Sequence, residues 1–190
     1  MRKFLVLAVA VLSLLGGVAI PAAARGSATP YCGIRWGSLP EQDSHYTSAM
    51  ITNLRAGRHE CFDRLVIDLG PRDPGLPGPE GNGYQVRYVS QFTSDPSGKP
   101  IPLAGAADLS IVVHARAVDD YGRPTYRPAN AASAVNVAGF STFRQVVFDG
   151  TFEGQTQIGL GVRARLPFRV FSLAGPGGGS RLVIDVAHRW

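Results

Sequence analysis

One short apolar pattern occurs twice in the chain, and it constrains the fold more than any other feature. Residues 64–68 read Arg-Leu-Val-Ile-Asp, and residues 181–185 repeat the same five letters. Leucine, valine and isoleucine in runs of this length favour a pleated strand over a helix. We therefore predict that both pentapeptides are central strands of one sheet system. Chance similarity between two buried strands is the alternative explanation of the repeat.

Alternating apolar and polar residues predict further strands, which are separated by glycine- and proline-rich turns. The expected strands cover residues 49–54, 61–69, 84–92, 108–118, 143–148, 155–165, 168–173 and 181–187. Gly150 is expected to end the strand that begins at Phe143, and helical composition occurs only at 129–138. Short strands between turns are typical of an all-β antiparallel β-sandwich. We predict about seven to nine strands and at most one short helix.

Three of these strands have a clear apolar side. Leu65, Ile67 and Leu69 should face the interior from the strand at 61–69. The apolar sides of the strands at 108–118 and 155–165 are Leu109, Ile111, Val113 and Ala115, and Thr156, Ile158, Leu160, Val162 and Ala164. Gly159 and Gly161 fall on the opposite side of the latter strand, which indicates that another part of the chain approaches that backbone closely.

The first 24 residues have the three parts of a secretory signal peptide. Two basic residues precede an apolar run over 4–20, and Ala22 and Ala24 form an A-x-A cleavage pattern. A retained anchor is the alternative, but the run contains two glycines and falls short of the roughly 20 apolar residues of a spanning helix. The expected divisions are a signal peptide at 1–24, an irregular N-terminal segment at 25–48 and one domain at 49–190.

The charge balance argues against nucleic acid as a partner. The formal charge of the sequence is +5, and loss of the cations Arg2 and Lys3 with the signal peptide would lower it to +3. A nucleic-acid binder usually carries a dense basic stripe, and the sequence contains none. No second apolar run follows, so we expect no membrane span after signal cleavage. The expected location is outside the cytoplasmic membrane, either secreted or bound to the cell wall.

Cys32 and Cys61 are the only two cysteines in the sequence. Because cysteines in an oxidising compartment usually pair, we predict a disulfide between them. The bond would close a loop of about 30 residues and stabilise the fold by roughly 3–4 kcal/mol in the chain-entropy model. It would also tie the N-terminal segment to the first long strand. A redox-active pair is the alternative, but such pairs usually have the closer spacing C-x-x-C.

Several stretches resemble the AMIN-like proteins exported by actinobacteria. The resemblance is carried by Tyr-Cys-Gly-Ile-Arg-Trp-Gly-Ser-Leu-Pro at 31–40, by residues 52–68, and by the closing stretches 168–171 and 181–185. AMIN domains are β-sandwiches attached to N-acetylmuramoyl-alanine amidases and to secretion or pilus proteins, which they target to the envelope by binding peptidoglycan. The resemblance therefore implies an envelope-binding domain. No amidase domain follows it in the sequence, so we do not expect amidase activity.

No residue pattern in the sequence predicts catalysis. No serine stands in a G-x-S-x-G elbow, and Asp119-Asp120 lacks the spaced oxygen ligands of a calcium loop. The four histidines lack H-E-x-x-H or comparable spacing: His45, His59, His114 and His188. We expect no metal, no cofactor and no enzyme activity, and His59 should fix its turn by bonding Asp63 or a backbone carbonyl. A hydrolase with a site assembled from distant residues is the enzymatic alternative.

The loop over residues 119–127 is the best candidate for ligand binding. Tyr121 and Tyr126 offer flat faces for stacking on sugar rings, and Arg123 and Arg127 offer guanidinium groups for wall carboxylates or phosphates. Loops on a rigid sandwich often carry function. The alternative is a hairpin whose tyrosines pack back on the sheet.

A second candidate surface is a set of four outward-facing arginines on the late strands: Arg163, Arg165, Arg169 and Arg181. The alternative is that these are ordinary exposed arginines, paired with strand acids such as Asp185.

Taken together, the sequence predicts an exported, non-catalytic binding module that associates with the cell envelope, with peptidoglycan or another wall glycan as ligand. The alternative is a structural or interaction domain that adds a sheet edge or loops to an envelope protein.

Overall fold

The computed structural model describes residues 30–73 and 82–190, and within these ranges the fold is all-β. Its strands are β1 (Glu41–Asp43), β2 (Ile51–Arg58), β3 (Phe62–Leu69), β4 (Tyr84–Val89), β5 (Ala107–Val113), β6 (Phe143–Phe152), β7 (Gln155–Val162), β8 (Phe168–Ala174) and β9 (Ser180–Ala187). Its 3-10 turns are η1 (Tyr31–Gly33), η2 (Ala131–Ser133) and η3 (Pro176–Gly178). The predicted all-β class is confirmed, while the predicted signal peptide lies outside the described residues. None of the helical turns described could cross a membrane.

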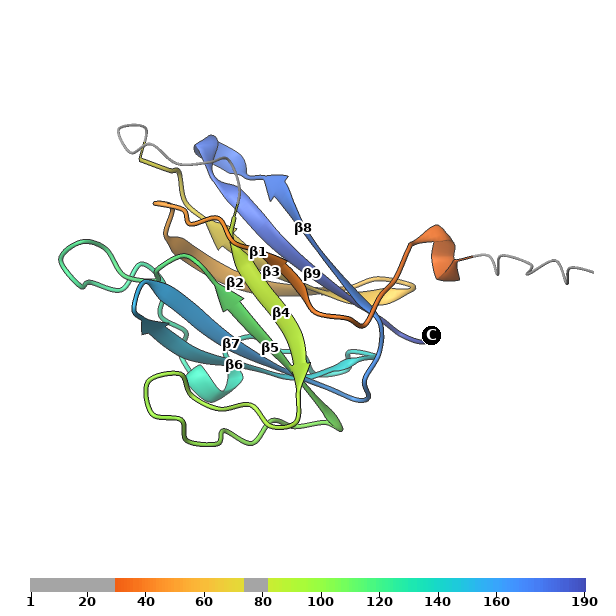
Figure 1. The fold of residues 1–190 in the computed structure, drawn as a ribbon. Coiled ribbons are helices and arrows are strands. Elements are labelled where there is room, and N and C mark those ends of the chain that lie inside the picture. Colours follow the sequence, from red (N-terminus) through yellow and green to blue (C-terminus); the bar gives the residue numbers. More distant parts are fainter. Residues whose placement is uncertain (1–29, 74–81) are drawn as a thin grey trace, which may run out of the picture.

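The strands form two antiparallel sheets stacked face to face (Figure 1). The five-stranded sheet has the order β1-β4-β5-β7-β6, and the four-stranded sheet has the order β2-β3-β9-β8. Tight hairpins join β2 to β3, β6 to β7 and β8 to β9. The prediction of an antiparallel β-sandwich with seven to nine strands is confirmed.

The two copies of the Arg-Leu-Val-Ile-Asp pattern pair directly with each other. They lie in β3 and β9, which are antiparallel neighbours at the centre of the four-stranded sheet. The register puts the central Val66 opposite Val183, so each leucine of one copy faces the isoleucine of the other. The arginine of one copy likewise lies opposite the aspartate of the other. Both pentapeptides are therefore central strands, as predicted.

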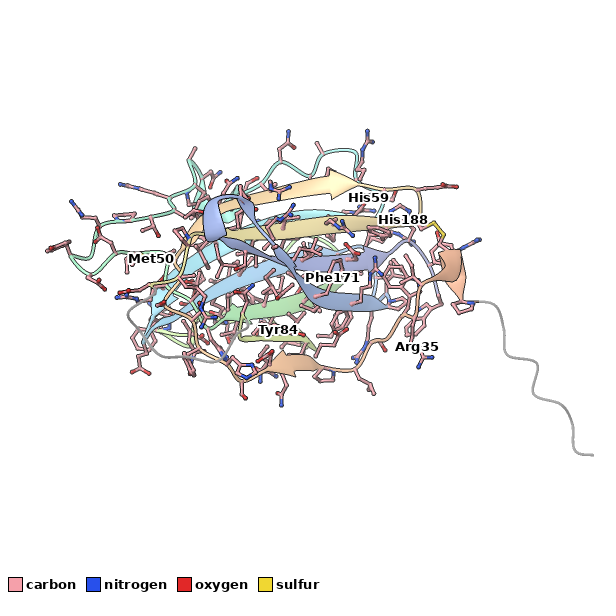
Figure 2. The ribbon with its side chains drawn as sticks, turned by 90° about the horizontal axis from the view of Figure 1, so that it is seen from above. Arg35, Met50, His59, Tyr84, Phe171 and His188 are labelled. Carbon is pink, nitrogen blue, oxygen red and sulfur yellow. A yellow bond between two sulfur atoms is a disulfide. The ribbon has the colours of Figure 1, made fainter. Side chains whose placement is uncertain are left out.

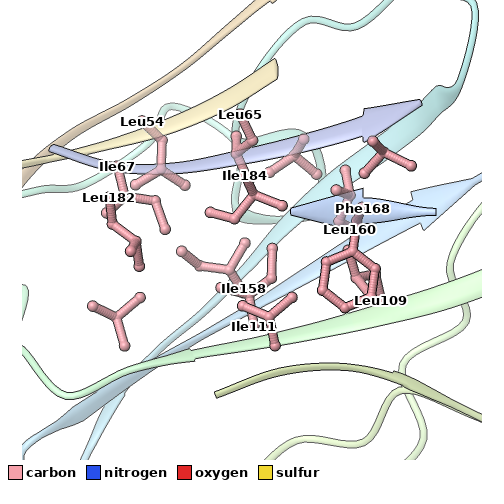
Figure 3. Close-up of a cluster of buried hydrophobic side chains, with 14 of the residues drawn as sticks. Leu54, Leu65, Ile67, Leu109, Ile111, Ile158, Leu160, Phe168, Leu182 and Ile184 are labelled. Atoms are coloured by element: carbon pink, nitrogen blue, oxygen red, sulfur yellow. The ribbon is translucent and has the colours of Figure 1, made fainter. Parts of the chain in front are cut away.

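The hydrophobic core fills the space between the inner faces of the two sheets (Figure 3). Its fully buried aliphatic side chains include Leu65, Ile67, Leu182 and Ile184 from one sheet and Leu109, Ile111, Ile158 and Leu160 from the other. These are the residues that alternation places inward, because successive side chains of a strand point to opposite faces. Burial of each such side chain stabilises the fold by about 1.5–3 kcal/mol.

Several strand ends differ from the sequence prediction by a few residues, and two of these differences have a clear physical reason. The strand expected over 108–118 ends at Val113, because the following backbone leaves the ladder and bonds to side chains: Ala117 N–H donates to Thr151 Oγ1 at 2.9 Å. The strand expected to stop before Gly150 continues to Phe152. Gly150 has a φ of 112° at a register shift, so this glycine accommodates a bulge and the ladder resumes beyond it.

The N-terminal segment contributes more regular structure than its composition predicts. Residues 41–43 form β1, which pairs with β4 at the edge of the five-stranded sheet, with Gln42 opposite Gln85. Glu41 also accepts a hydrogen bond from the backbone N–H of Val170 on β8, at 3.1 Å. This short strand therefore contacts both sheets.

A loop covers the outer side of β7, as the two glycines of that strand predicted. A Cβ atom at Gly159 would come within 2.8 Å of the Phe92 ring, and a Cβ atom at Gly161 would collide with the carbonyl oxygen of Ala104. The connection between β4 and β5 therefore packs directly on the backbone of β7. It also forms one wall of a groove on this side of the sandwich.

Candidate binding face

A row of three charged side chains crosses the outer face of the four-stranded sheet. Asp185 on β9 lies opposite Arg64 on β3 and opposite Arg169 on β8. Arg64 donates from Nε to Oδ1 at 2.7 Å and from Nη2 to Oδ2 at 2.9 Å. Arg169 donates to Oδ2 from Nε at 2.8 Å and from Nη2 at 2.7 Å. One carboxylate thus holds two guanidinium groups, and the row keeps one unmatched positive charge.

The aspartate of this row is buried, whereas the sequence predicted only a partner for exposed arginines. The side chain of Asp185 is 0% exposed, whereas those of Arg64 and Arg169 are 23% and 32% exposed. A buried carboxylate is tolerated when its oxygens are paired and hydrogen-bonded. The two guanidinium groups above it remain partly accessible to a ligand.

Three aromatic rings enclose the two arginines. The guanidinium carbon of Arg64 lies 5.1 Å from the centre of the Phe62 ring and 5.4 Å from that of Phe171. The guanidinium of Arg169 lies over the same two rings at 5.5 and 5.0 Å, and over Trp36 at 5.4 Å. Cation–π contacts of this kind fix the orientation of a guanidinium group. Phe171 is seen on β8 in the view from above (Figure 2).

The period of two along each strand produces this arrangement. On β3, Leu65 and Ile67 point into the core, so Phe62 and Arg64 point outward. The same alternation turns Asp185 outward on β9. The register between the two pentapeptides then brings arginine and aspartate into one row.

A hollow of about 220 Å³ lies beside the row. Its lining includes Arg55, Gly57, His59, Arg64, Val66 and Arg181. Gly57 lies opposite Arg64 in the ladder, and an added Cβ atom there would meet only the His59 ring, at 3.8 Å. The missing side chain therefore leaves open space next to a guanidinium group. We call the row, its three aromatic rings and this hollow the arginine face.

The arginine face has more positive than negative charge. Besides the row, it contains Arg55, which donates to both oxygens of Asp68 at 2.8 and 3.0 Å. It also contains Arg181, which donates to the backbone oxygen of Ala174. Four arginines thus face two aspartates, an excess of two positive charges. An anion with an apolar part fits this combination of guanidinium groups and rings.

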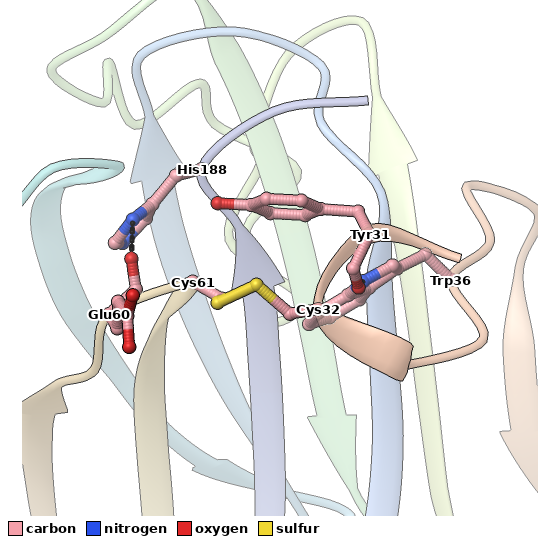
Figure 4. The surroundings of a disulfide bond; sticks show 6 residues. All are labelled: Tyr31, Cys32, Trp36, Glu60, Cys61 and His188. Carbon is pink, nitrogen blue, oxygen red and sulfur yellow. Dashed lines mark hydrogen bonds between the residues drawn. A yellow bond between two sulfur atoms is a disulfide. The ribbon is translucent and has the colours of Figure 1, made fainter. Parts of the chain in front are cut away.

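The disulfide and a short bridge hold Trp36 at the edge of the arginine face. Cys32 and Cys61 are joined, with their Cα atoms 6.4 Å apart. Figure 4 shows this bond between the 3-10 turn η1 and the start of β3. Trp36 Nε1 donates to the carbonyl oxygen of Tyr31 at 2.9 Å, and the next residue, Gly37, pairs with β8 in an isolated bridge. The N-terminal segment is therefore positioned to complete the face.

Of the loop residues predicted to bind ligand, Tyr121 and Arg123 form one exposed pair. The Tyr121 residue is 85% exposed, and the guanidinium carbon of Arg123 lies 5.0 Å from its ring centre. Arg123 Nε also donates to Asp119 Oδ2 at 2.7 Å. Desolvation alone would raise the pKa of the Asp119 carboxyl, but the hydrogen bonds that it accepts from Arg123 and Tyr121 lower this pKa below its ordinary value. The loop tip is thus a small charged and aromatic surface of its own.

The other two predicted loop residues lie in different surroundings. Tyr126 is half-buried, edge-on to Phe148 with ring centres 5.2 Å apart, and its hydroxyl lies 3.5 Å from the carbonyl oxygen of Ala134. Burial raises the pKa of the Tyr126 hydroxyl. Arg127 is exposed and forms no ion pair within the residues that the structure describes. Tyr126 therefore supports the loop, while Arg127 is available beside it.

The four late arginines do not share one surface. Arg169 and Arg181 belong to the arginine face, whereas Arg163 and Arg165 lie in the connection between β7 and β8. Arg163 donates to the backbone oxygen of His188. The sequence located the arginines but missed the aromatic rings around them, because Trp36, Phe62 and Phe171 come from three separate stretches.

The histidines have structural contacts in the described ranges, where no group of three or more His, Cys, Asp or Glu is placed to hold a metal ion. His59 stacks on Phe62 with ring centres 4.5 Å apart, and its backbone N–H donates to the carbonyl oxygen of Phe62 at 2.9 Å. Of the two predicted partners, His59 thus bonds a backbone carbonyl and not Asp63. Asp63 points to the inner side of β3, and its histidine partner is His188, whose Nε2 lies 3.1 Å from Oδ1. The backbone N–H groups of Thr142 and Phe143 also donate to Asp63.

Comparison with known protein families identifies the family to which the sandwich belongs. Residues 49–188 match the model of the AMIN-like domain family. The matched span runs from the start of β2 to the end of β9 and contains the arginine face except Trp36. No curated protein matches the sequence.

Proposed function

We propose that this chain, which belongs to the AMIN-like domain family, is a non-catalytic binding module of the cell envelope and that its ligand is peptidoglycan. The family match and the disulfide are consistent with a location outside the cytoplasm. The observation that carries the proposal is the row of Arg64, Asp185 and Arg169, in which one buried carboxylate holds two partly exposed guanidinium groups.

Peptidoglycan offers the two kinds of group that the arginine face is suited to bind. Its peptide stems carry carboxylates, which a guanidinium group binds through paired hydrogen bonds. Its sugar rings have apolar C–H surfaces, which can pack against Trp36 and Phe171. Because Asp185 and the rings already fix Arg64 and Arg169, little side-chain freedom is lost when a ligand binds.

The loop over residues 119–127 is a second candidate surface for the same ligand. Tyr121 and Arg123 place an exposed ring beside a guanidinium group, and Arg127 adds another exposed cation. The loop has no buried carboxylate that holds its arginines in place, and Arg123 is committed to Asp119. We therefore rank the arginine face first.

The test is cosedimentation of the protein with purified wall sacculi at low and high salt. The double variant Arg55→Gln/Arg181→Gln removes the excess charge of the arginine face from exposed or half-exposed positions, so it should still fold. The control Arg58→Gln/Arg144→Gln removes the same charge elsewhere. We expect the first variant to bind about tenfold more weakly, the control to bind like the parent, and salt to weaken binding only in part, since ring packing survives screening.

A third protein, Tyr121→Ala/Arg127→Gln, examines the loop in the same assay. If it alone loses binding at an unchanged melting temperature, the ligand site is the loop and not the arginine face. If the parent does not sediment with sacculi at any salt concentration, peptidoglycan is not the ligand. The interaction-domain alternative would then be favoured, with β2 and β6, each an edge strand of its sheet, as the surfaces for a partner strand.

A further inference from the structure

A second hollow lies on the opposite side of the sandwich, on the outer face of the five-stranded sheet. It has a volume of about 290 Å³. Most of its lining is polar and includes Gln85, Arg87, Asp95, Ser110, Gln155 and Gln157. The loop that packs on β7 supplies Asp95, and β4, β5 and β7 supply the other five. We call this hollow the polar groove.

Two of the groove's polar side chains are almost completely buried. Ser110 and Gln157 are each 6% exposed, although both lie on the outer face of the sheet. Gln157 Oε1 accepts a hydrogen bond from the backbone N–H of Asp95 at 2.9 Å. The Ser110 hydroxyl has no hydrogen-bond partner in the residues that the structure describes. No fully buried side-chain nitrogen or oxygen in the described ranges lacks a partner, so the Ser110 oxygen is open to the groove, where a ligand can bond to it.

The register of the strands arranges these groups in two neighbouring rows. Gln85 and Gln157 flank Val112 in one row, and Arg87 lies beside Ser110 in the next. Arg87 Nε donates to Gln85 Oε1 at 3.2 Å, which links the rows. Amide and hydroxyl groups of this kind both donate and accept hydrogen bonds.

A flat platform of two stacked rings lies at one end of the groove. The rings of Tyr46 and His114 are 4.7 Å apart with an interplanar angle of 18°. Tyr46 is 57% exposed, and its hydroxyl accepts a hydrogen bond from Gln155 Nε2 at 3.1 Å. His114 Nδ1 lies 3.0 Å from the carbonyl oxygen of His45, which fixes the platform. A planar ligand face can therefore lie on Tyr46 while its edges reach the glutamines.

The polar groove has no excess charge, in contrast to the arginine face. Arg87 and Asp95 are its two charged side chains and offset each other, and His114 adds a charge only when protonated. A strongly anionic or cationic ligand would gain little here. The groove suits a neutral ligand that is rich in hydroxyl groups and has one flat apolar face.

We propose that the polar groove binds a neutral saccharide. A pyranose ring has an apolar C–H face that matches the Tyr46 platform, and equatorial hydroxyl groups that match the glutamine amides and Ser110. Ligand sites commonly combine an apolar surface with a few convergent polar groups in this way. The site is separate from the arginine face, and its existence does not depend on peptidoglycan binding there.

The experiment is an NMR titration of the protein with three neutral oligosaccharides: cellohexaose, chitohexaose and a mannohexaose. The side-chain amide signals of Gln85, Gln155 and Gln157 should shift and saturate with at least one of them. Tyr46→Ala should weaken that binding about tenfold or more, as expected for loss of an aromatic anchor. Ser110→Ala should weaken it less but measurably, and should not lower the melting temperature, because the hydroxyl has no internal partner.

Two variants serve as matched controls. Trp190→Ala removes an aromatic ring beside the disulfide, at a residue that is 70% exposed. Ser141→Ala removes an exposed serine hydroxyl in the loop before β6. Both should bind the saccharide like the parent. Absence of saturable shifts with all three hexaoses overturns the proposal. So does unchanged binding by folded Tyr46→Ala and Ser110→Ala, or saturation of the same signals by a neutral peptide alone.

Discussion

Arg64 and Asp185 form a two-pronged ion pair across β3 and β9, and they are the first residue of one pentapeptide and the last residue of the other. The same register places an aspartate opposite an arginine at the other end of the pentapeptides, where Asp68 lies opposite Arg181. These two do not pair: Asp68 accepts from Arg55, and Arg181 donates to a backbone carbonyl. A symmetric sequence repeat therefore has an asymmetric pattern of charge pairs, with the buried pair at one end only.

This asymmetry predicts different effects of the same substitution in the two copies. Asp185→Asn leaves two half-buried guanidinium groups without a full counter-charge, so it should lower the free energy of unfolding by about 3 kcal/mol. Asp68→Asn breaks the more exposed pair with Arg55 and should cost less than about 1 kcal/mol. Urea denaturation of both variants measures the difference. Equal losses would mean that the burial of Asp185 contributes nothing to the strength of its pairs.

The paired pentapeptides should also be sensitive to truncation of their inward side chains. Leu65→Ala or Ile184→Ala removes a fully buried side chain at the centre of the core, and each should cost about 2–5 kcal/mol. Leu39→Ala, at a residue that is 77% exposed, should stay within about 0.5 kcal/mol of the parent. Thermal melts followed by circular dichroism measure all three. A helix-dominated spectrum of the parent would contradict the fold itself.

The hydroxyl of Tyr88 on β4 bonds to the connection between β7 and β8, which runs from one sheet to the other, and should stabilise the sandwich. It donates to the carbonyl oxygen of Leu166 at 2.6 Å and accepts from the N–H of the same residue at 3.0 Å. Tyr88→Phe leaves both backbone groups of Leu166 without this partner and should cost about 1–3 kcal/mol. Tyr84→Phe is the matched control, since that half-buried hydroxyl has no hydrogen bond among the described residues. A similar loss in both variants would rule out a specific role for the bond.

The same tyrosine should make stability depend on pH in the alkaline range. Burial raises the pKa of Tyr88 from 10.0 to about 12. Between these values the folded protein keeps a proton that the unfolded chain has lost, so the free energy of unfolding falls as pH rises through this window. Below pH 10 the group has no effect on the pH dependence. Urea midpoints across the window should fall less steeply in Tyr88→Phe than in the parent, and parallel curves would contradict the assignment.

The disulfide between Cys32 and Cys61 should be complete in the native protein. Alkylation under denaturing, non-reducing conditions should modify neither Cys32 nor Cys61. Reduction should lower the free energy of unfolding by roughly 3–4 kcal/mol, because the unfolded chain regains the conformational entropy that closure of this loop had removed; the two cysteines are 29 positions apart. It should also change the fluorescence of Trp36, which the bond holds against Arg169, while Trp190→Ala protein should show the same change. Two reactive thiols in the native protein would exclude the bond.

The fold was largely predictable because strand alternation is a local property. The positions of Leu65 and Ile184 in the core follow from neighbours along their own strands. Gly150 was misjudged because a glycine can either end a strand or form a bulge, and its φ of 112° depends on the pairing of β6 with β7. The sequence shows the glycine but not its partner strand.

The candidate binding face was less predictable, because it depends on register and on contacts between distant stretches. Arg169 was identified as an outward-facing arginine, but its position beside Asp185 depends on the turn between β8 and β9. The disulfide that ties the segment of Trp36 to β3 was predicted, but no pattern around residue 36 indicates the bridge from Gly37 to β8 that brings the ring to the face. The loop residues were adjacent in sequence and therefore easy to group, yet Tyr126 turned out to pack on Phe148.

The direct pairing of the two pentapeptides also determines when the sandwich can close. Arg64 and Asp185 are 121 positions apart, and β9 is the last of the described strands to be synthesised. Until it arrives, β3 can pair with β2 but has an apolar edge without a neighbour. Pairing of such distant segments is slow, and the exposed edge is prone to aggregation in the meantime. The four-stranded sheet is therefore completed only after β9, the last of the described strands, has been synthesised.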